Sequence, residues 1–265
     1  MKEIKKHQPG NFSWNDLLTT DAKAAKAFYG KLFGYTAEDT PAGPDSAYTM
    51  FNLHNKAVAA MYERSAEQKE QGIPPHWDSY ITVENVDEAC KKVKALEGTV
   101  IQEPFDVMEA GRMGIIKDPT GAVLALWQPN ENIGSEITGI PGTVVWNELG
   151  TNNTEKANKF YTQLLDWDSE TSEMINTVYT AFLLEKKPVA GMFQMPPEMG
   201  DTPSQWVPYF SVEDCDASVK IAQELGANVL QPPTDIPGTG RFSMLQDPQG
   251  AAFGILQSEP MEEQE

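Results

Sequence analysis

Two pairs of residues in this sequence combine an aromatic ring with a carboxylate: Trp14 with Asp16, and Trp146 with Glu148. Alternate residues of a β-strand point to the same side, so each pair would share one face of a sheet. A carboxylate on a buried face needs a partner or takes a raised pKa. It could hold a cationic ligand or act as a general base, while the indole could stack on a flat or cationic molecule.

Two further pairs recur in the same way: Trp77 with Trp206, and Arg112 with Arg241. We expect the second pair of tryptophans to face the same presumed cavities as the first. The predicted ligand-binding set is then Trp14, Asp16, Trp77, Arg112, Trp146, Glu148, Trp206 and Arg241. Two structural alternatives remain open. The tryptophans could simply fill a core, and the arginines could neutralise the two carboxylates in salt bridges.

These pairs exist because the chain repeats itself. The stretch 12–35 recurs as 143–167, and the pair Phe28-Tyr29 returns in it as Phe160-Tyr161. The stretch 77–128 recurs as 206–257, and Asp118 returns in it as Asp247. A repeat of this length determines the architecture, so we predict two tandem copies of one domain.

We place the two domains at residues 1–133 and 134–265. In the first, a strand leads into an amphipathic helix that Asp21 begins as N-cap and Gly34 ends. Short strands follow, then a second helix and a hairpin around the turn that Asp118 begins. Each copy therefore reads as two βαβββ units, four in the whole chain.

Composition limits the partners. The chain has 39 acidic against 20 basic residues and a formal net charge of −19, which disfavours nucleic acid and anionic membrane surfaces. We find no secretory signal and no apolar run long enough to span a membrane. Cys90 and Cys215 fall on apolar helix faces, so we expect buried free thiols and a cytoplasmic protein.

The repeated pattern resembles the vicinal oxygen chelate superfamily of glyoxalases, bleomycin-resistance proteins and extradiol dioxygenases. The motifs that carry the resemblance are Phe28-Tyr29 before Leu-Phe-Gly-Tyr, the acidic turn Val-Glu-Asn-Val-Asp into the second helix, and Asp-Pro-x-Gly before the last strand. The resemblance implies an α+β fold. Four βαβββ units would form two tandem paired domains, whose curled mixed sheets make cups around a cavity.

The resemblance also indicates where metal-using members hold their ion. This chain fills those positions with Trp14, Trp77 and Ala125, and in the second copy with Trp146, Trp206 and Gly254. An indole N–H only donates hydrogen bonds, and Ala and Gly carry no ligating group. By strand alternation His76 would point away from the cup, although a one-residue shift in register would bring it inward. We therefore expect no metal and no other cofactor.

The sequence favours a metal-independent small-molecule-binding protein of the glyoxalase and bleomycin-resistance type, which takes a flat or cationic ligand in cups lined by tryptophan. The alternative is a lyase, isomerase or dioxygenase of the same superfamily. A third hypothesis confines the site to one copy, which the matched Trp and carboxylate pairs disfavour. Because paired units in one chain can supply a dimer's contacts, we expect a monomer.

Overall fold

The computed structural model describes residues 1–43, 46–174, 177–200 and 202–259. In the first copy the elements are β1 (Lys2–Glu3), β2 (Phe12–Thr19), α1 (Ala22–Phe33), β3 (Thr36–Gly43), β4 (Ser46–Leu53), β5 (Lys56–Glu63), α2 (Ala66–Glu70), β6 (His76–Thr82), α3 (Val86–Ala95), β7 (Thr99–Val107), β8 (Gly111–Lys117) and β9 (Val123–Pro129). They are followed by β10 (Ile137–Thr138), β11 (Val144–Thr151), α4 (Thr154–Leu165), β12 (Asp168–Met174), β13 (Thr177–Leu184), β14 (Lys187–Gln194), the 3-10 turn η1 (Pro197–Met199), β15 (Gln205–Ser211), α5 (Cys215–Glu224), β16 (Asn228–Ile236), β17 (Gly240–Gln246) and β18 (Ala252–Ser258).

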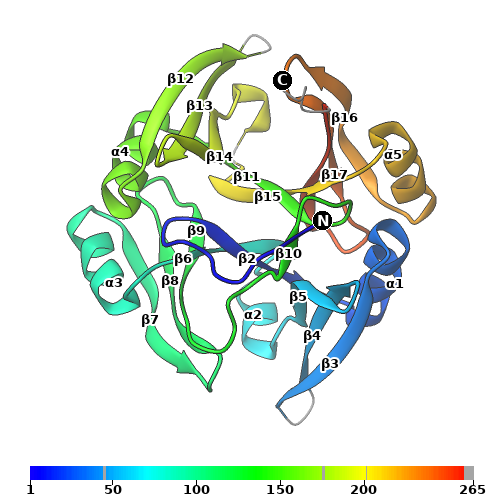
Figure 1. Ribbon diagram of the computed structural model, residues 1–265, viewed down its shortest axis with the longest axis horizontal. Helices are drawn as coiled ribbons and strands as arrows, with labels where there is room; N and C mark the ends of the chain where they lie inside the picture. The colour runs from blue at the N-terminus through cyan, green and yellow to red at the C-terminus, as the bar shows by residue number, and fades with distance from the viewer. Residues whose placement is uncertain (44–45, 175–176, 201, 260–265) are drawn as a thin grey trace.

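Each copy builds its own eight-stranded mixed sheet. The strand orders are β3-β4-β5-β2-β6-β9-β8-β7 and β12-β13-β14-β11-β15-β18-β17-β16. Both sheets curl into arches with the helices α1, α3, α4 and α5 on the outside, and α2 lies at the opening of the first arch (Figure 1). The predicted α+β fold with two curled mixed sheets is confirmed, and each cup forms within one copy. The domain boundary at residue 133 stays a prediction.

The first helix of each copy begins and ends as its sequence indicates. Asp21 caps α1 by accepting a hydrogen bond from the Ala24 amide, and Gly34 ends the helix in the left-handed conformation at φ 76°. In the second copy Asp166 takes the same left-handed place after α4 at φ 55°. An aspartate tolerates this conformation better than most residues do, so the two helices end alike without a second glycine.

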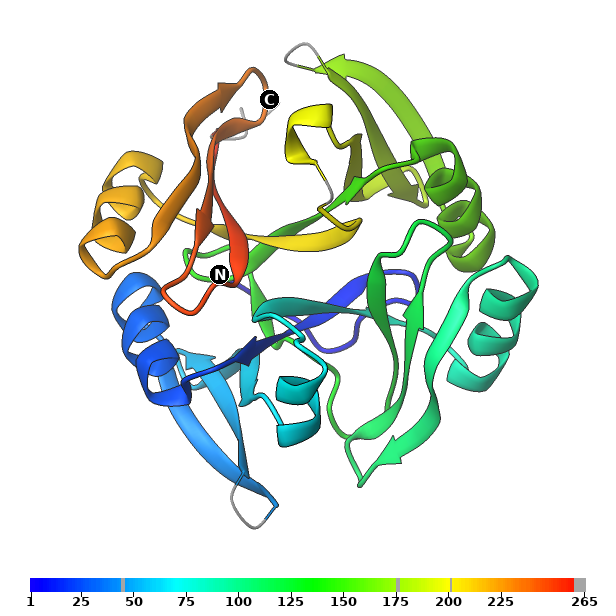
Figure 2. The ribbon, with the colours of Figure 1, turned by 180° about the vertical axis from the view of Figure 1, so that it is seen from behind.

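The two arches stand back to back, and their convex faces share one core. Figure 2 shows α1 beside α5 and α3 beside α4, so each helix pair combines the two copies. Phe33 of α1 stacks on Phe210 of β15 with ring centroids 4.9 Å apart. At the centre, Asn15 Nδ2 donates to Asn147 Oδ1 over 3.3 Å. Side chains on the convex faces therefore join the copies, and those on the concave faces are available for a site.

Candidate ligand-binding site

The first concave face, defined here by Trp14, Asp16, Tyr48 and Tyr80, is centred on a buried carboxylate. Asp16 is 4% exposed and accepts three hydrogen bonds. Trp14 Nε1 donates to Oδ1 over 2.7 Å, Tyr48 Oη donates to Oδ1 over 2.7 Å, and Tyr80 Oη donates to Oδ2 over 2.8 Å. Burial raises the pKa of Asp16 to about 6, although the tyrosine hydrogen bonds act against it.

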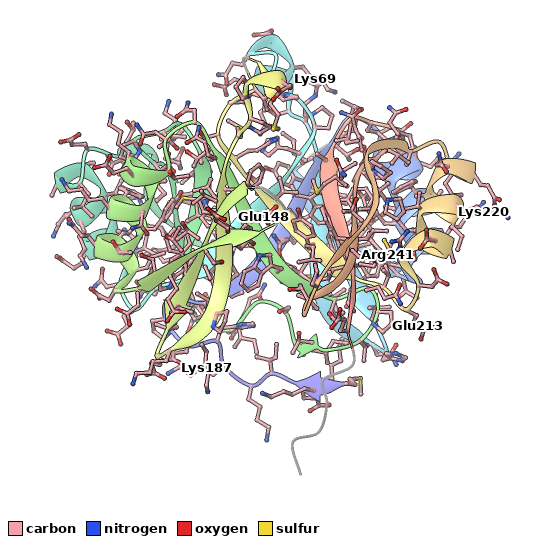
Figure 3. The ribbon with its side chains drawn as sticks, turned by 90° about the horizontal axis from the view of Figure 1, so that it is seen from above. Lys69, Glu148, Lys187, Glu213, Lys220 and Arg241 are labelled. Atoms are coloured by element: carbon pink, nitrogen blue, oxygen red, sulfur yellow. The ribbon has the colours of Figure 1, made fainter. Side chains whose placement is uncertain are left out.

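The second concave face, defined by Trp146, Glu148, Tyr179 and Tyr209, repeats the same arrangement. Tyr179 Oη donates to Glu148 Oε1 over 2.9 Å, and Tyr209 Oη donates to Oε2 over 2.6 Å. Trp146 Nε1 donates to Tyr179 Oη over 2.9 Å. Figure 3 looks toward the opening of this sheet, with Glu148 between its two arms. Burial raises the pKa of Glu148, partly offset by the two tyrosines.

The first face also holds a histidine, His76, that the sequence analysis expected to point away from it, and this histidine pairs with an aspartate. Asp78 lies directly across from Asp16 on the neighbouring strand. His76 Nε2 lies 3.1 Å from Asp78 Oδ1, and Tyr62 Oη donates to Asp78 Oδ2 over 3.0 Å. The prediction that His76 points away from the cup was therefore wrong. The register is the one-residue alternative, in which His76, Asp78 and Tyr80 share the concave face.

Trp77 lies on the convex face, so its predicted place in the cup is also wrong. Trp77 pairs with Leu17 across the antiparallel strands β6 and β2, and paired residues point to the same side. Leu17 already faces α1. Trp77 Nε1 donates to Tyr29 Oη over 3.1 Å, and Tyr29 Oη donates to Asp247 Oδ2 over 3.0 Å. This chain of hydrogen bonds crosses from the first copy to the second.

Trp206 makes the reciprocal connection, and the same correction applies to it. Trp206 pairs with Leu149 and donates from Nε1 to Tyr161 Oη over 2.8 Å. The charge of Asp118, in the first copy, raises the pKa of Tyr161 further after burial has raised it. The Phe-Tyr motif, the Asp-Pro-x-Gly motif and the second tryptophan therefore build the joint between the copies.

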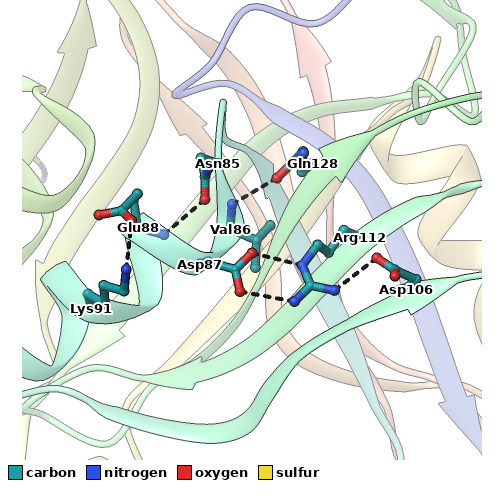
Figure 4. A network of polar contacts seen from close by, with 8 residues as sticks. All are labelled: Asn85, Val86, Asp87, Glu88, Lys91, Asp106, Arg112 and Gln128. Carbon is teal, nitrogen blue, oxygen red and sulfur yellow. Dashed lines mark hydrogen bonds and ion pairs between the residues drawn. The ribbon is translucent and has the colours of Figure 1, made fainter.

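The two arginines of the predicted set lie away from both carboxylates. Arg112 donates from Nε and Nη2 to Asp87 over 2.8 and 2.9 Å, and from Nη1 to Asp106 over 2.9 Å (Figure 4). Arg241 binds Asp216 and Asp235 in the same way. Each arginine ties the first turn of a helix to an edge strand. The alternative that they neutralise Asp16 and Glu148 is therefore also wrong.

The sequence reasoning missed the four tyrosines that hold the two carboxylates. A signal for them exists in the repeat, where Tyr48 returns as Tyr179 and Tyr80 returns as Tyr209. Both spacings match the register of the surrounding strands, so each tyrosine recurs with its carboxylate. Hydroxyl donors at repeated positions were a better guide to the partners of the carboxylates than the arginines.

A cavity of about 230 Å³ lies between the sheets where β2 and β11 begin. Trp14 and Trp146 both border it, together with Ser13, Asn15 and Asn147. No charged side chain lines it. The cavity therefore suits water or a small neutral molecule. The carboxylates Asp16 and Glu148 lie on the concave faces instead.

A family model for the Glyoxalase/Bleomycin resistance protein/Dioxygenase superfamily matches this chain twice, over residues 12–126 and 140–255. The chain belongs to that superfamily. The two matched segments correspond to the two copies, and they include Asp16 and Glu148 with the four tyrosines that contact them.

Two relatives are similar over most of their length. The chain is 39% identical over 264 residues to "Putative glyoxylase CFP32" of Mycobacterium tuberculosis (strain CDC 1551 / Oshkosh), covering 99% of this chain and 100% of that protein. It is 34% identical over 259 residues to "Anthracycline biosynthesis protein DnrV" of Streptomyces peucetius, covering 94% of each. The solved Mn(II)-bound glyoxalase from Novosphingobium aromaticivorans superposes with a TM-score of 0.63 at 14% identity, covering 94% of this chain and 82% of that one. At that identity the likeness shows the fold alone.

The donor set of this chain does not fit the divalent ion that many superfamily members use. Among the described residues no group of three or more His, Cys, Asp or Glu side chains is arranged to hold a metal. The oxygens of Asp16 and Glu148 accept hydrogen bonds from hydroxyl and indole groups. A metal ion bound to these oxygens would meet the positively polarised hydrogens of the same donors. Ala125 and Gly254, on the last strands, offer no ligand. The described polar and aromatic groups of these faces are the carboxylates, the tyrosine hydroxyls, the tryptophan indoles and, on the first face, the imidazole of His76.

In the part of the chain that the structure describes, no helix is long and apolar enough to cross a membrane.

Proposed function

We propose that this protein is a metal-independent small-molecule-binding member of the superfamily, whose ligand is flat or cationic and contacts a concave face lined by tryptophan and tyrosine. The observation that carries the proposal is the pair of carboxylates Asp16 and Glu148. Asp16 is buried and Glu148 is partly buried. Their hydrogen-bond partners within the described residues are neutral tyrosine or tryptophan groups.

A desolvated carboxylate without a positive partner is costly, because the surrounding protein replaces water poorly. Among the described residues no basic side chain makes a hydrogen bond to Asp16 or Glu148, so neither carboxylate has a positively charged partner in direct contact. A ligand that carries a positive charge would supply the missing partner. The rings of Trp146 and Tyr179 beside Glu148 would attract the same cation through their π faces.

The relatives support a flat ligand. DnrV is named for anthracycline biosynthesis, and anthracyclines are polycyclic aromatic compounds. Such a ring system matches an aromatic surface because offset stacking requires only an exposed π face. We transfer only this chemical class to the present chain.

One observation favours an isomerase or lyase as a second candidate. Asp16 has a pKa raised to about 6, near the range in which a carboxylate exchanges protons efficiently at neutral pH. The hydroxyls of Tyr48 and Tyr80 donate to Asp16 while it is ionised. Once Asp16 has taken a proton from a substrate, they could turn and donate to the oxyanion that develops there. Turnover of an activated carbonyl compound that is lost in Asp16→Asn would favour this candidate over binding alone.

We also infer a monomeric, cytoplasmic protein. The two copies cover each other's convex faces, as in the contact between Phe33 and Phe210, and so supply the contacts that separate subunits would otherwise make. Cys90 and Cys215 are free and buried, which suits a reducing compartment.

A panel of planar cationic dyes and planar neutral analogues, tested by thermal shift, examines the proposed function. We expect cationic members to raise the melting temperature and at least one of the variants Glu148→Gln and Asp16→Asn to reduce that rise. The matched control is Glu213→Gln, which removes one charge from an exposed position of the second copy. A panel in which no compound stabilises the wild-type protein would refute the proposal.

A further inference from the structure

The two concave faces differ in how completely side chains fill them. At four positions that the strand pairing makes equivalent, the second copy carries the smaller residue: Ala60 and Gly191, Met50 and Ala181, Ala125 and Gly254, Trp127 and Leu256. Exposure follows this difference. Trp14 is 6% and Trp127 7% exposed on the first face. Trp146 and Glu148 remain partly exposed on the second.

Two of these glycines also seat the tyrosines that hold Glu148. A Cβ added at Gly191 would lie 1.8 Å from Tyr179 Oη, and one at Gly254 would lie 2.3 Å from the Tyr209 ring. The rings therefore lie flat against the backbone, where only glycine leaves room. Each hydroxyl occupies one lone pair of the carboxylate, so further lone pairs of Glu148 remain for a ligand.

The faces also differ in which ionisable side chains they carry. On the first face both ring nitrogens of His76 meet acceptors, Asp78 Oδ1 at 3.1 Å and the Pro74 carbonyl at 2.8 Å. Both contacts are hydrogen bonds when the ring is protonated, so this face has a side chain that can supply a cation beside Asp78. Burial alone would lower the pKa of His76, but Asp78 outweighs it and raises that pKa.

The second face has no such cation among its described residues. The positions of His76 and Asp78 are taken there by Gln205 and Val207, as the pairing with Gly150 and Glu148 shows. Glu148 is thus a single carboxylate among Trp146, Tyr179, Tyr209 and partly exposed Phe242. Aromatic rings around one carboxylate are the arrangement that recognises an organic ammonium group, through cation–π attraction and one ion pair.

We propose that the chain binds one ligand, on the second concave face only, and that this ligand carries an organic ammonium group attached to a flat ring. Glu148 pairs with the ammonium, and Trp146, Tyr179 and Tyr209 surround it. The first face is filled by its own side chains, and its histidine is paired with Asp78. This proposal rests on the proposed function and adds to it the site, the stoichiometry and the ligand class.

Calorimetric titration with benzyltrimethylammonium, and with benzyl alcohol as its neutral counterpart, tests the proposal on the full chain. We expect one site per chain for the ammonium and much weaker binding of the alcohol. Glu148→Gln keeps the shape of the side chain and should lower the affinity at least about tenfold, the loss of a partly desolvated charge pair. The control Glu213→Gln should bind as wild type does.

The outcomes separate this proposal from the proposed function. Two sites per chain, or binding that survives in Glu148→Gln but is lost in Asp16→Asn, would overturn the assignment to the second face while small-molecule binding stands. Equal affinity for the ammonium and the alcohol would overturn the ligand class. If no compound of this kind or of the planar panel binds, the proposed function itself fails. Circular dichroism of each variant verifies that it is folded.

Discussion

Replacing Asp16 by asparagine should change how the stability of the protein depends on pH. The amide would keep the shape of the side chain and remove its titration. In the wild-type protein the carboxylate is 4% exposed and its pKa is raised from 3.8 to about 6, chiefly by burial. The folded state therefore holds a proton on Asp16 in a pH range where the unfolded chain has released it.

The sign follows from this difference in proton binding. Because the folded state binds the proton more tightly, Asp16 contributes stability that is fully present below pH 3.8 and is lost as pH rises through about 6. One pKa unit corresponds to about 1.36 kcal/mol, so the contribution lost is about 3 kcal/mol. Asp16→Asn should thus gain about 2 kcal/mol relative to wild type between pH 4 and pH 7.5, because the unfolded carboxyl is already partly ionised at pH 4.

Urea denaturation of both proteins across that pH range measures the effect. The other carboxylates titrate in both proteins, so the difference between the two free energies of unfolding isolates Asp16. A difference that stays constant with pH would mean that Asp16 is solvated in the folded protein. Water, and not only Trp14, Tyr48 and Tyr80, would then surround Asp16. In that case the carboxylate would not need a charged partner, and the argument for a cationic ligand would fail.

Two other predictions concern the joint between the copies and the absence of a metal. Tyr29→Phe removes the hydroxyl that links Trp77 to Asp247 and leaves two buried polar atoms unpaired, so urea denaturation should show a loss of about 2–4 kcal/mol. A change below about 0.5 kcal/mol would show that water replaces the hydroxyl there. EDTA should leave the melting temperature unchanged, since no group of three or more His, Cys, Asp or Glu side chains among the described residues is arranged to hold a metal. A fall of several degrees that one metal ion alone reverses would contradict this.

Much of the fold could be predicted because the sequence contains an internal repeat, so that each local pattern occurs twice. A local signal that recurs in the same order and register seldom arises by chance, which is why the helix caps, the hairpin turns and the two βαβββ units of each copy could be placed. The edge strand Thr36–Gly43 carried no such signal. Its side chains are exposed throughout, so it shows no buried alternation for a pattern to reveal.

The candidate site could be predicted only in part, because the face of a strand depends on register. Trp14 and Asp16 were placed correctly from one strand, where alternation is a local property. Trp77 was misplaced because its face depends on pairing with Leu17, and a shift of one residue inverts every side chain of a strand. Sequence alone fixes the alternation within β6 but not which half of its residues faces the cup.

The misplacement of the tryptophans separates two roles that the repeat had combined. Trp77 with Tyr29 and Trp206 with Tyr161 hold the copies together through Asp247 and beside Asp118. Each set of contacts combines a tryptophan and a tyrosine of one copy with an aspartate of the other. Both copies therefore keep all three residue types. The residues of a concave face need no matching residue in the other copy, since each face lies within a single sheet. One face could therefore fill with its own side chains and the other could stay open, while the motifs that reveal the fold remained the same in both.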